Sequence, residues 1–178
     1  MSIGSMHPGN SRLTRTLVLG LALLGLALKP GDQAPEFTAL NQNETPVTLS
    51  SFRGSPVILF FYPKDQTPGC TQEACHFRDE YLKFKKKGAV ILGVSVQDSK
   101  EHQKFREKHR LPFDLLVDSQ GSVADQFGVG RIPLLGLLQR KTVLISAEGK
   151  IVRVYESVNP ETHAQEVLKD LESLSPKK

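Results

Sequence analysis

The sequence has little cysteine and lacks the motifs of the common cofactor-binding proteins. Its two cysteines, Cys70 and Cys75, do not form a Cys-x-x-Cys pair, and no cysteine spacing typical of zinc sites occurs. The sequence contains no Walker phosphate loop and no Gly-x-Gly-x-x-Gly turn. These absences argue against a zinc protein, a P-loop nucleotide-binding protein and a dinucleotide-dependent enzyme. The five histidines show no metal-ligand spacing either, so we expect them to be solvent-exposed and expect no metal site.

The charge distribution gives little sign of nucleic-acid binding. The chain of 178 residues has a net charge of +4, but basic and acidic residues alternate along it. Only residues 83–87 concentrate lysines, at the end of an expected helix, where positive charge complements the helix dipole. We therefore expect no nucleic-acid partner. The length suits one domain with a single core, which we place at residues 28–174, followed by a flexible tail at 175–178.

The longest apolar run lies near the N-terminus and is too short to span a bilayer comfortably. Two arginines precede the run from Leu17 to Leu28, and Gly25 and Ala27 supply small residues at its end. This order of basic, apolar and small residues is typical of a secretory signal peptide. We expect residues 1–27 to direct export to a bacterial periplasm or thylakoid lumen, or to anchor the protein. An internal start at Met6, or a cytoplasmic protein, is the alternative.

The centre of the sequence is a strand that leads into a cysteine. The continuous apolar run from Val57 to Tyr62 predicts a strand buried on both faces. After Pro63 and a Thr-Pro-Gly turn, a helix is expected from near Thr71 to about Lys87. Cys70 would then lie at a helix N-terminus, where free N–H groups and the helix dipole favour an anion. The sequence therefore predicts a site that favours the thiolate, the nucleophilic form of cysteine.

The second cysteine lies five residues further along the same expected helix. Five helical residues would separate the two Cα atoms by roughly 8.7 Å. This separation exceeds the ~7 Å that a disulfide bridges without backbone movement. The spacing therefore favours a redox cycle with local unwinding over a structural disulfide.

The remaining pattern predicts a thioredoxin-like α/β fold, with a central mixed β-sheet flanked by helices. An N-terminal β-hairpin is expected within residues 33–47, and an Asn159 cap with Pro160 begins the last helix. The other expected elements are strands at 89–96, 113–117, 142–145 and 151–155, helices at 98–109 and 121–127, and a loop at 128–139. The buried side chains expected on the helices are Ala74, Phe77, Tyr81, Phe84, Ala164, Val167, Leu168, Leu171 and Leu174.

The pattern Pro63-x-x-x-Thr67-x-x-Cys70 resembles the active-site signature of the peroxiredoxins. With Cys75 five residues later, the chain is similar to the peroxiredoxin Q, or bacterioferritin comigratory protein, subfamily, over nearly all of residues 28–171. The leucine-rich segment before Arg140 is most similar to the cyanobacterial and plastid branch. The further matching segments are Gly93-Val94-Ser95, Asp98-Ser99, Leu111-Pro112-Phe113, Phe127-Gly128-Val129 and Gln139-Arg140-Lys141-Thr142.

The resemblance implies a thiol-dependent peroxidase with Cys70 as the nucleophile. Thr67 and the N–H groups of Gly69 and Cys70 would hold the peroxide, Arg140 would stabilise the thiolate and polarise the O–O bond, and Pro63 would shield the sulfur from water. No flavin, haem or other cofactor is implied. Arg131 has no counterpart in the family, and we expect it at the surface.

The implied cycle of an atypical two-cysteine enzyme uses Cys75 as the resolving cysteine. Hydrogen peroxide or an alkyl hydroperoxide converts Cys70 to a sulfenic acid, a Cys70–Cys75 disulfide follows, and thioredoxin or a similar dithiol reduces it. Glu73 is either an orienting partner of Arg140, through a bidentate pair, or a plain carboxylate in the first helical turn. Lys64 and Asp65 match the family but carry no assigned chemistry. We expect a monomer.

Two other functions stay open from the residues alone. One is a thioredoxin-like thiol–disulfide oxidoreductase acting on protein thiols, which the absence of Cys-x-x-Cys disfavours. The other is a non-catalytic binding module that docks partners through Leu134, Leu135, Leu137 and Leu138. No role is assigned to the loop at 132–138 otherwise.

Overall fold

The structure is a computed structural model that describes Met1 and residues 27–174. The expected signal peptide lies outside the described residues, apart from Met1 and Ala27, and so does the tail at 175–178. Within the described part of the chain, no helix has the length and apolar character needed to cross a membrane.

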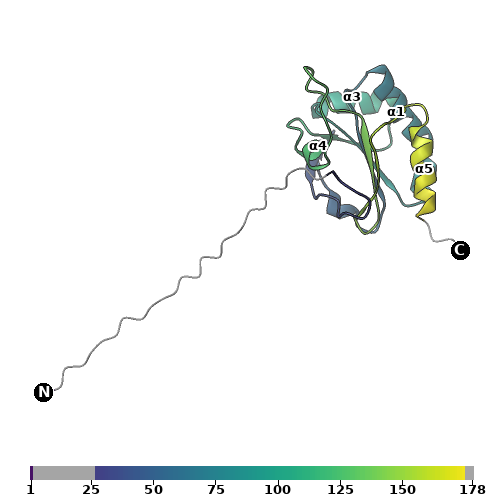
Figure 1. Cartoon of the computed structure of the whole chain (residues 1–178). Coiled ribbons are helices and arrows are strands. Elements are labelled where there is room, and N and C mark those ends of the chain that lie inside the picture. The colour runs from purple at the N-terminus through teal and green to yellow at the C-terminus, as the bar shows by residue number, and fades with distance from the viewer. Residues whose placement is uncertain (2–26, 175–178) are drawn as a thin grey trace.

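The fold is a seven-stranded mixed sheet with the strand order β2-β1-β5-β4-β3-β6-β7, covered by helices on both faces (Figure 1). This arrangement confirms the predicted thioredoxin-like class. The strands are β1 (Thr38–Asn41), β2 (Pro46–Thr48), β3 (Val57–Phe61), β4 (Val90–Ser95), β5 (Asp114–Val117), β6 (Lys141–Ile145) and β7 (Ile151–Tyr155). The helices are η1 (Leu49–Phe52), α1 (Pro68–Asp79), α2 (Tyr81–Lys86), α3 (Ser99–His109), α4 (Ser122–Gln126) and α5 (His163–Ser173).

Strand β3 lies at the centre and contributes to two cores. All five of its residues are buried, as the apolar run predicted. Val57, Leu59 and Phe61 face the core that includes α4, whereas Ile58 and Phe60 face the core that includes α1, α3 and α5. Figure 1 shows α1 and α5 on one side of the sheet and α4 on the other.

The active-site helix differs from its prediction in both bounds. It begins at Pro68, three residues before Thr71, because proline suits the first helical position, where no N–H donor is needed. It ends at Asp79, and the separate α2 continues to Lys86. Phe77 of α1 and Phe84 of α2 nevertheless pack in the same core, with ring centroids 5.8 Å apart, as their helical spacing predicted.

The last helix also differs from its prediction. It begins at His163, and Asn159 precedes it as part of a turn, in which its side chain accepts from the N–H of Glu161. Leu174 follows the last helical residue and is 39% exposed, so its expected burial was wrong. Tyr81 is only half-buried. The helix α3 and the N-terminal hairpin confirm their predictions, and Asp98 caps α3 by accepting from the N–H of Glu101 at 2.9 Å.

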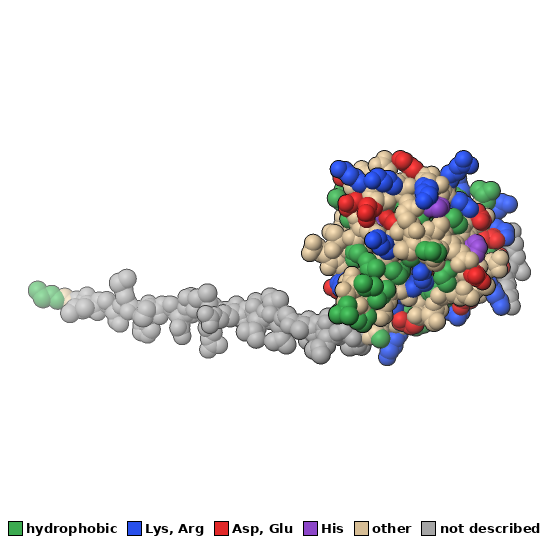
Figure 2. Space-filling model, turned by 90° about the horizontal axis from the view of Figure 1, so that it is seen from above, with side chains coloured by type: hydrophobic (Ala, Val, Ile, Leu, Met, Phe, Trp, Pro, Cys, Tyr) green, Lys and Arg blue, Asp and Glu red, His purple; other side chains and the backbone are tan. Residues whose placement is uncertain are grey.

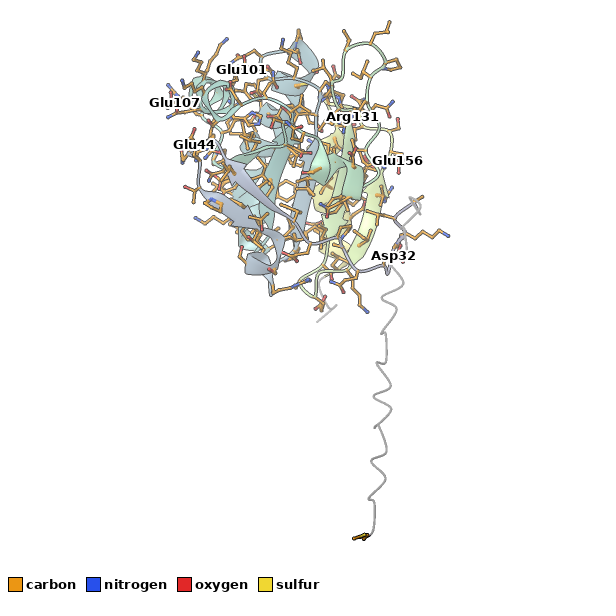
Figure 3. All side chains as sticks on the ribbon, turned by 90° about the vertical axis from the view of Figure 1, so that its left-hand side faces the viewer. Asp32, Glu44, Glu101, Glu107, Arg131 and Glu156 are labelled. Carbon is orange, nitrogen blue, oxygen red and sulfur yellow. The ribbon has the colours of Figure 1, made fainter. Side chains whose placement is uncertain are left out.

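The visible surface carries both signs of charge. Figure 2 shows lysine and arginine side chains interspersed with aspartate and glutamate on one face of the folded part. Arg131, expected at the surface and labelled in Figure 3, is half-exposed. It donates to Asp125 of α4 at 2.8 Å. In the leucine-rich loop, Leu134 and Leu135 are exposed, whereas Leu138 is fully buried and cannot belong to a docking face.

Candidate active site

Cys70 lies in the first turn of α1, beyond the end of the central strand β3. Thr67 is the N-cap residue, Pro68 is the first helical residue and Cys70 is the third. The N–H groups of this turn have no acceptor within the helix, and the helix dipole adds positive potential there. Cys70 is free and only 1% exposed. The sulfur is therefore held in a protected place whose backbone favours negative charge.

Arg140 lies beside Cys70 because of the strand pairing. β6 runs antiparallel to β3 with Phe61 opposite Lys141, so the residue before β6 lies next to the segment that follows β3. The Arg140 Nη2 group donates to the Cys70 sulfur at 3.4 Å. Burial alone would lower the pKa of Arg140, but attraction to Glu73 and Cys70 outweighs it and raises that pKa. The guanidinium is thus a fixed positive charge in contact with the sulfur.

Glu73 is the acidic partner of this guanidinium. Its side chain is 1% exposed, and its Oε2 accepts from Arg140 Nη1. The other oxygen, Oε1, has no hydrogen-bond partner among the described residues, so the expected bidentate pair is not formed. Burial raises the pKa of Glu73 to about 7, although Arg140 acts in the opposite direction. Glu73 is therefore more than a surface carboxylate of the first turn.

Pro63, Thr67 and Gly69 lie shortly before Cys70 in the sequence, in the turn after β3 and at the start of α1. A Cβ atom at Gly69 would lie 3.2 Å from Arg140 Nη2, so glycine allows the guanidinium to approach the helix closely. The Thr67 hydroxyl donates to the Lys64 carbonyl at 2.9 Å and does not cap α1. Pro63 is half-buried in the turn between β3 and α1. Arg140 thus lies against Cys70, Glu73 and Gly69, and Thr67 lies at the start of the same helix.

Cys75 is on the same unbroken helix as Cys70, and both thiols are free. Cys75 is half-buried, and its sulfur lies 4.0 Å from His109 Nδ1 at the end of α3. Burial lowers the pKa of His109, and the nearby cations Lys108 and Arg78 lower it further. His109 is therefore a weak base in contact with the second thiol, a neighbour that the sequence analysis did not identify.

The structure also corrects the expectation that the histidines are solvent-exposed. His102 and His163 are fully buried. His163 Nε2 contacts the Thr142 hydroxyl at 2.8 Å beneath α5. His102 contacts Asp65, the residue to which the sequence analysis assigned no chemistry. The spacing of His102, Phe105 and His109, at i, i+3 and i+7 of α3, was the signal that these side chains share the inward face of the helix.

No group of three or more histidine, cysteine, aspartate or glutamate side chains suited to a metal occurs in the described part of the chain. The chemistry available at the site comes from the thiol, the guanidinium, the hydroxyl of Thr67 and backbone N–H groups. Together these can activate a thiolate and hold two oxygens of a small substrate.

The comparisons with known proteins agree on one family. The model of the AhpC/TSA family matches residues 30–154. The chloroplastic peroxiredoxin Q of Sedum lineare is 45% identical over 146 residues, which is 81% of this chain and 78% of that protein. The peroxiredoxin Bcp of Bacillus subtilis is 39% identical over 158 residues, covering 85% of this chain and the whole of that protein. The crystal structure of peroxidoxin BcpB from Mycobacterium tuberculosis matches with a TM-score of 0.78 at 39% identity, over 83% of this chain and 99% of that chain.

Proposed function

The chain belongs to the AhpC/TSA family, within its peroxiredoxin Q and Bcp proteins, and from this premise we propose how its residues carry out peroxide reduction. The enzyme is a thiol-dependent peroxidase. The single observation that carries the residue assignment is the contact of Arg140 with both the Cys70 sulfur and the buried Glu73.

In the first step, the Cys70 thiolate attacks one oxygen of the peroxide. Arg140 and the first-turn N–H groups stabilise the thiolate and the negative charge that develops on the departing oxygen. The Thr67 hydroxyl gives up its hydrogen bond to the Lys64 carbonyl and donates one to the bound peroxide. The O–O bond breaks, Cys70 becomes a sulfenic acid, and water or an alcohol leaves.

In the second step, Cys75 attacks the Cys70 sulfenic acid and water leaves as the disulfide forms. The intact α1 of the reduced form would hold the Cα atoms roughly 8.7 Å apart, beyond disulfide reach. We infer that the first turns of α1 open before this bond forms. The half-buried position of Cys75 supports this step, since the thiol moves without leaving a large cavity in the core.

An external dithiol then reduces the disulfide. Thioredoxin or a thioredoxin-like protein fits this role, because exchange requires only a thiolate that can attack one exposed sulfur. Hydrogen peroxide and alkyl hydroperoxides are the proposed substrates, and a monomer is the proposed working unit.

Export through a leader at residues 1–27 is a separate proposal, supported by the basic, apolar and small residues of that segment. The plant relatives are named as chloroplastic proteins. The mass of the mature protein purified from its source tests it: cleavage after Ala27 is expected, and an intact N-terminus would contradict it.

Peroxide consumption by wild type and Cys70→Ser, with dithiothreitol as reductant, tests the function. Wild type should consume peroxide continuously, whereas Cys70→Ser should fold normally and lose turnover. Residual activity above roughly a tenth of wild type would contradict the role of Cys70, because a serine hydroxyl does not replace a thiolate nucleophile at neutral pH.

A further inference from the structure

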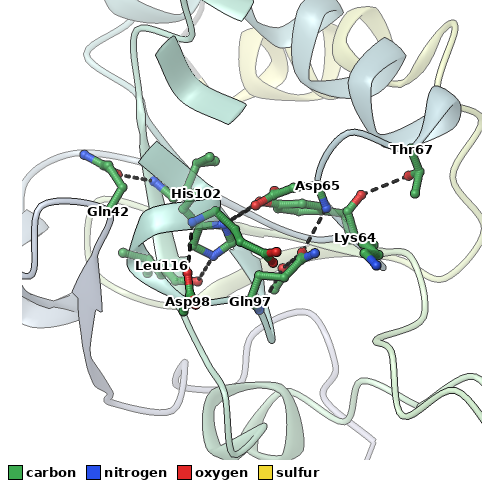
Figure 4. A network of polar contacts seen from close by, with 12 residues as sticks. Gln42, Lys64, Asp65, Thr67, Gln97, Asp98, His102 and Leu116 are labelled. Carbon is green, nitrogen blue, oxygen red and sulfur yellow. Dashed lines mark hydrogen bonds and ion pairs between the residues drawn. The ribbon is translucent and has the colours of Figure 1, made fainter. Parts of the chain in front are cut away.

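A fully buried histidine of α3 contacts the turn that precedes the active-site helix. His102 Nδ1 lies 2.7 Å from Asp65 Oδ2, and His102 Nε2 lies 3.1 Å from the Leu116 carbonyl oxygen. Neither His102 nor Asp65 is more than 4% exposed. Figure 4 shows the ring between these two partners, with Asp65 on the side of the active-site turn.

Both partners of the His102 ring are hydrogen-bond acceptors. The Leu116 carbonyl requires a proton on Nε2, and the contact at Nδ1 requires a second proton between the ring and the carboxyl group. Whichever side holds that second proton, His102 and Asp65 together are neutral and fully paired. A pair of this kind avoids the cost of an isolated buried charge, and its hydrogen bonds are strong because water is excluded.

Asp65 is held from two further directions. Its Oδ1 accepts from the Tyr62 hydroxyl at 2.7 Å, and its backbone N–H donates to Gln97 Oε1 at 2.8 Å. Gln97 Oε1 in turn accepts from the Ser95 hydroxyl at 2.8 Å. The side chain and backbone of this one residue are therefore fixed to β3, α3 and the end of β4.

The turn beyond Asp65 is strained and leads directly to the substrate side of the site. Gln66 has a φ of 62°, in the left-handed region that a residue with a side chain rarely adopts. Such a conformation persists only where its surroundings fix it. On its other side, Thr67 donates to the Lys64 carbonyl at 2.9 Å and begins α1. The placement of Thr67 thus depends on the turn that Asp65 anchors.

We propose that Asp65 and His102 are positioning residues, which fix the turn at residues 64–66 and thereby place the Thr67 hydroxyl for the peroxide. This inference rests on the proposed function. It predicts that loss of the pair slows the reaction of Cys70 with peroxide and leaves the intrinsic reactivity of its sulfur nearly unchanged, because Arg140, which contacts that sulfur, directly precedes β6 and is not part of the turn.

The experiment compares two reactions of one thiol in a Cys75→Ser background, where Cys70 is the only cysteine. The first is a single turnover with hydrogen peroxide, and the second is alkylation by iodoacetamide, which needs the thiolate but no peroxide-binding hydroxyl. The disruptive variant is Asp65→Ala. It leaves no buried charge, since the Tyr62 hydroxyl lies 3.4 Å from His102 Nδ1 and can pair with it.

Asp65→Ala should slow the peroxide reaction by about 10- to 100-fold, the range expected for a misplaced substrate contact, and change alkylation by less than about threefold. The conservative Asp65→Asn should keep both rates within about threefold of the parent, since its amide group can donate to Nδ1 of a neutral His102. His102→Leu removes the other member of the pair, on α3, and should have the same effect as Asp65→Ala. It replaces Asp65→Ala in the experiment if Asp65→Ala does not fold.

Phe37→Leu is the matched control for general loss of stability, because Phe37 belongs to the core on the opposite face of the sheet. It should lower the melting temperature without changing the ratio of the two rates. The inference is overturned if the rates fall together in Asp65→Ala and His102→Leu, or if neither falls. A parent protein that reacts with peroxide no faster than free cysteine would instead refute the proposed function itself.

Discussion

Two adjacent segments form the active site, and they are held in place by different kinds of contact. The turn at residues 63–66 is fixed by hydrogen bonds among Asp65, His102, Tyr62 and Gln97, none of which involves a cysteine. The first turns of α1 are held by Arg140, the residue before β6, which contacts Cys70 and Glu73. The hydrogen bonds of the turn are independent of the oxidation state of the thiols. The contact between Arg140 and Cys70 depends on it.

This difference suggests how the reaction itself opens the helix. A sulfenic acid attracts the Arg140 guanidinium far less than a thiolate does, since it carries no full negative charge. Oxidation therefore weakens one of the two contacts that hold the first turn of α1, while the turn before it keeps all of its hydrogen bonds. In the proposed cycle we therefore expect the opening to be confined to residues beyond Thr67, where Cys75 would approach Cys70.

Cys75→Ser removes the step that requires opening, and it should have the largest effect. The variant should consume about one equivalent of peroxide and then stop, with Cys70 trapped as a sulfenic acid that dimedone labels. Mass spectrometry of the labelled protein measures this outcome. Sustained turnover with thioredoxin would show that a thiol other than Cys75 resolves the sulfenic acid.

Arg140→Met removes the contact that joins α1 to β6. We expect the peroxide reaction to slow by roughly 100-fold, as on loss of one oriented donor to a developing negative charge. Stopped-flow kinetics of Cys70 oxidation measures the rate. Arg153→Met is the matched control, because Arg153 is a half-exposed arginine of β7 that pairs with Asp170 and Glu166 away from the sulfur. Equal losses in both variants would contradict a specific role for Arg140.

Glu73→Gln should remove a pH dependence from the free energy of unfolding. The pKa of Glu73 is about 7 in the folded protein against 4.5 for the free side chain. Between these values the unfolded chain has released the proton and the folded protein retains it, so the free energy of unfolding of wild type falls as pH rises from 4.5 to 7. The loss from this group is at most on the order of 3 kcal/mol.

Denaturant titrations of wild type and Glu73→Gln at pH 4.5, 6 and 7.5 measure this difference. The wild-type free energy of unfolding should fall relative to that of the variant over this range. Parallel curves would show that Glu73 keeps its ordinary pKa in the fold.

Features of the site that depend on neighbouring residues in the sequence were predicted better than features that depend on tertiary packing. The buried strand β3, the helix that follows it and the end of the helical region near Lys87 followed from patterns of neighbouring residues. The pairing of Glu73 with Arg140 was one of two open interpretations, because the two residues lie 67 positions apart in the sequence and the antiparallel register of β3 and β6 brings them together.

The buried polar network was missed for the same physical reason. The spacing of His102 with Phe105 and His109 indicates an inward position, but no local feature identifies its partner Asp65, which lies 37 positions away in the sequence. The break at Glu80 likewise has no signal in the helical spacing, which places Phe77 and Phe84 on one face whether or not the helix is continuous.

Hydrogen exchange on the reduced protein and on the Cys70–Cys75 disulfide form shows whether oxidation opens α1. Opening of α1 exposes amides that its helical hydrogen bonds protect, whereas the turn before it stays anchored through Asp65. Oxidation should remove the protection of the amides of residues 71–77 from exchange and leave that of residues 58–66 unchanged. Identical protection over residues 71–77 in both forms, or equal losses in both segments, would contradict this expectation.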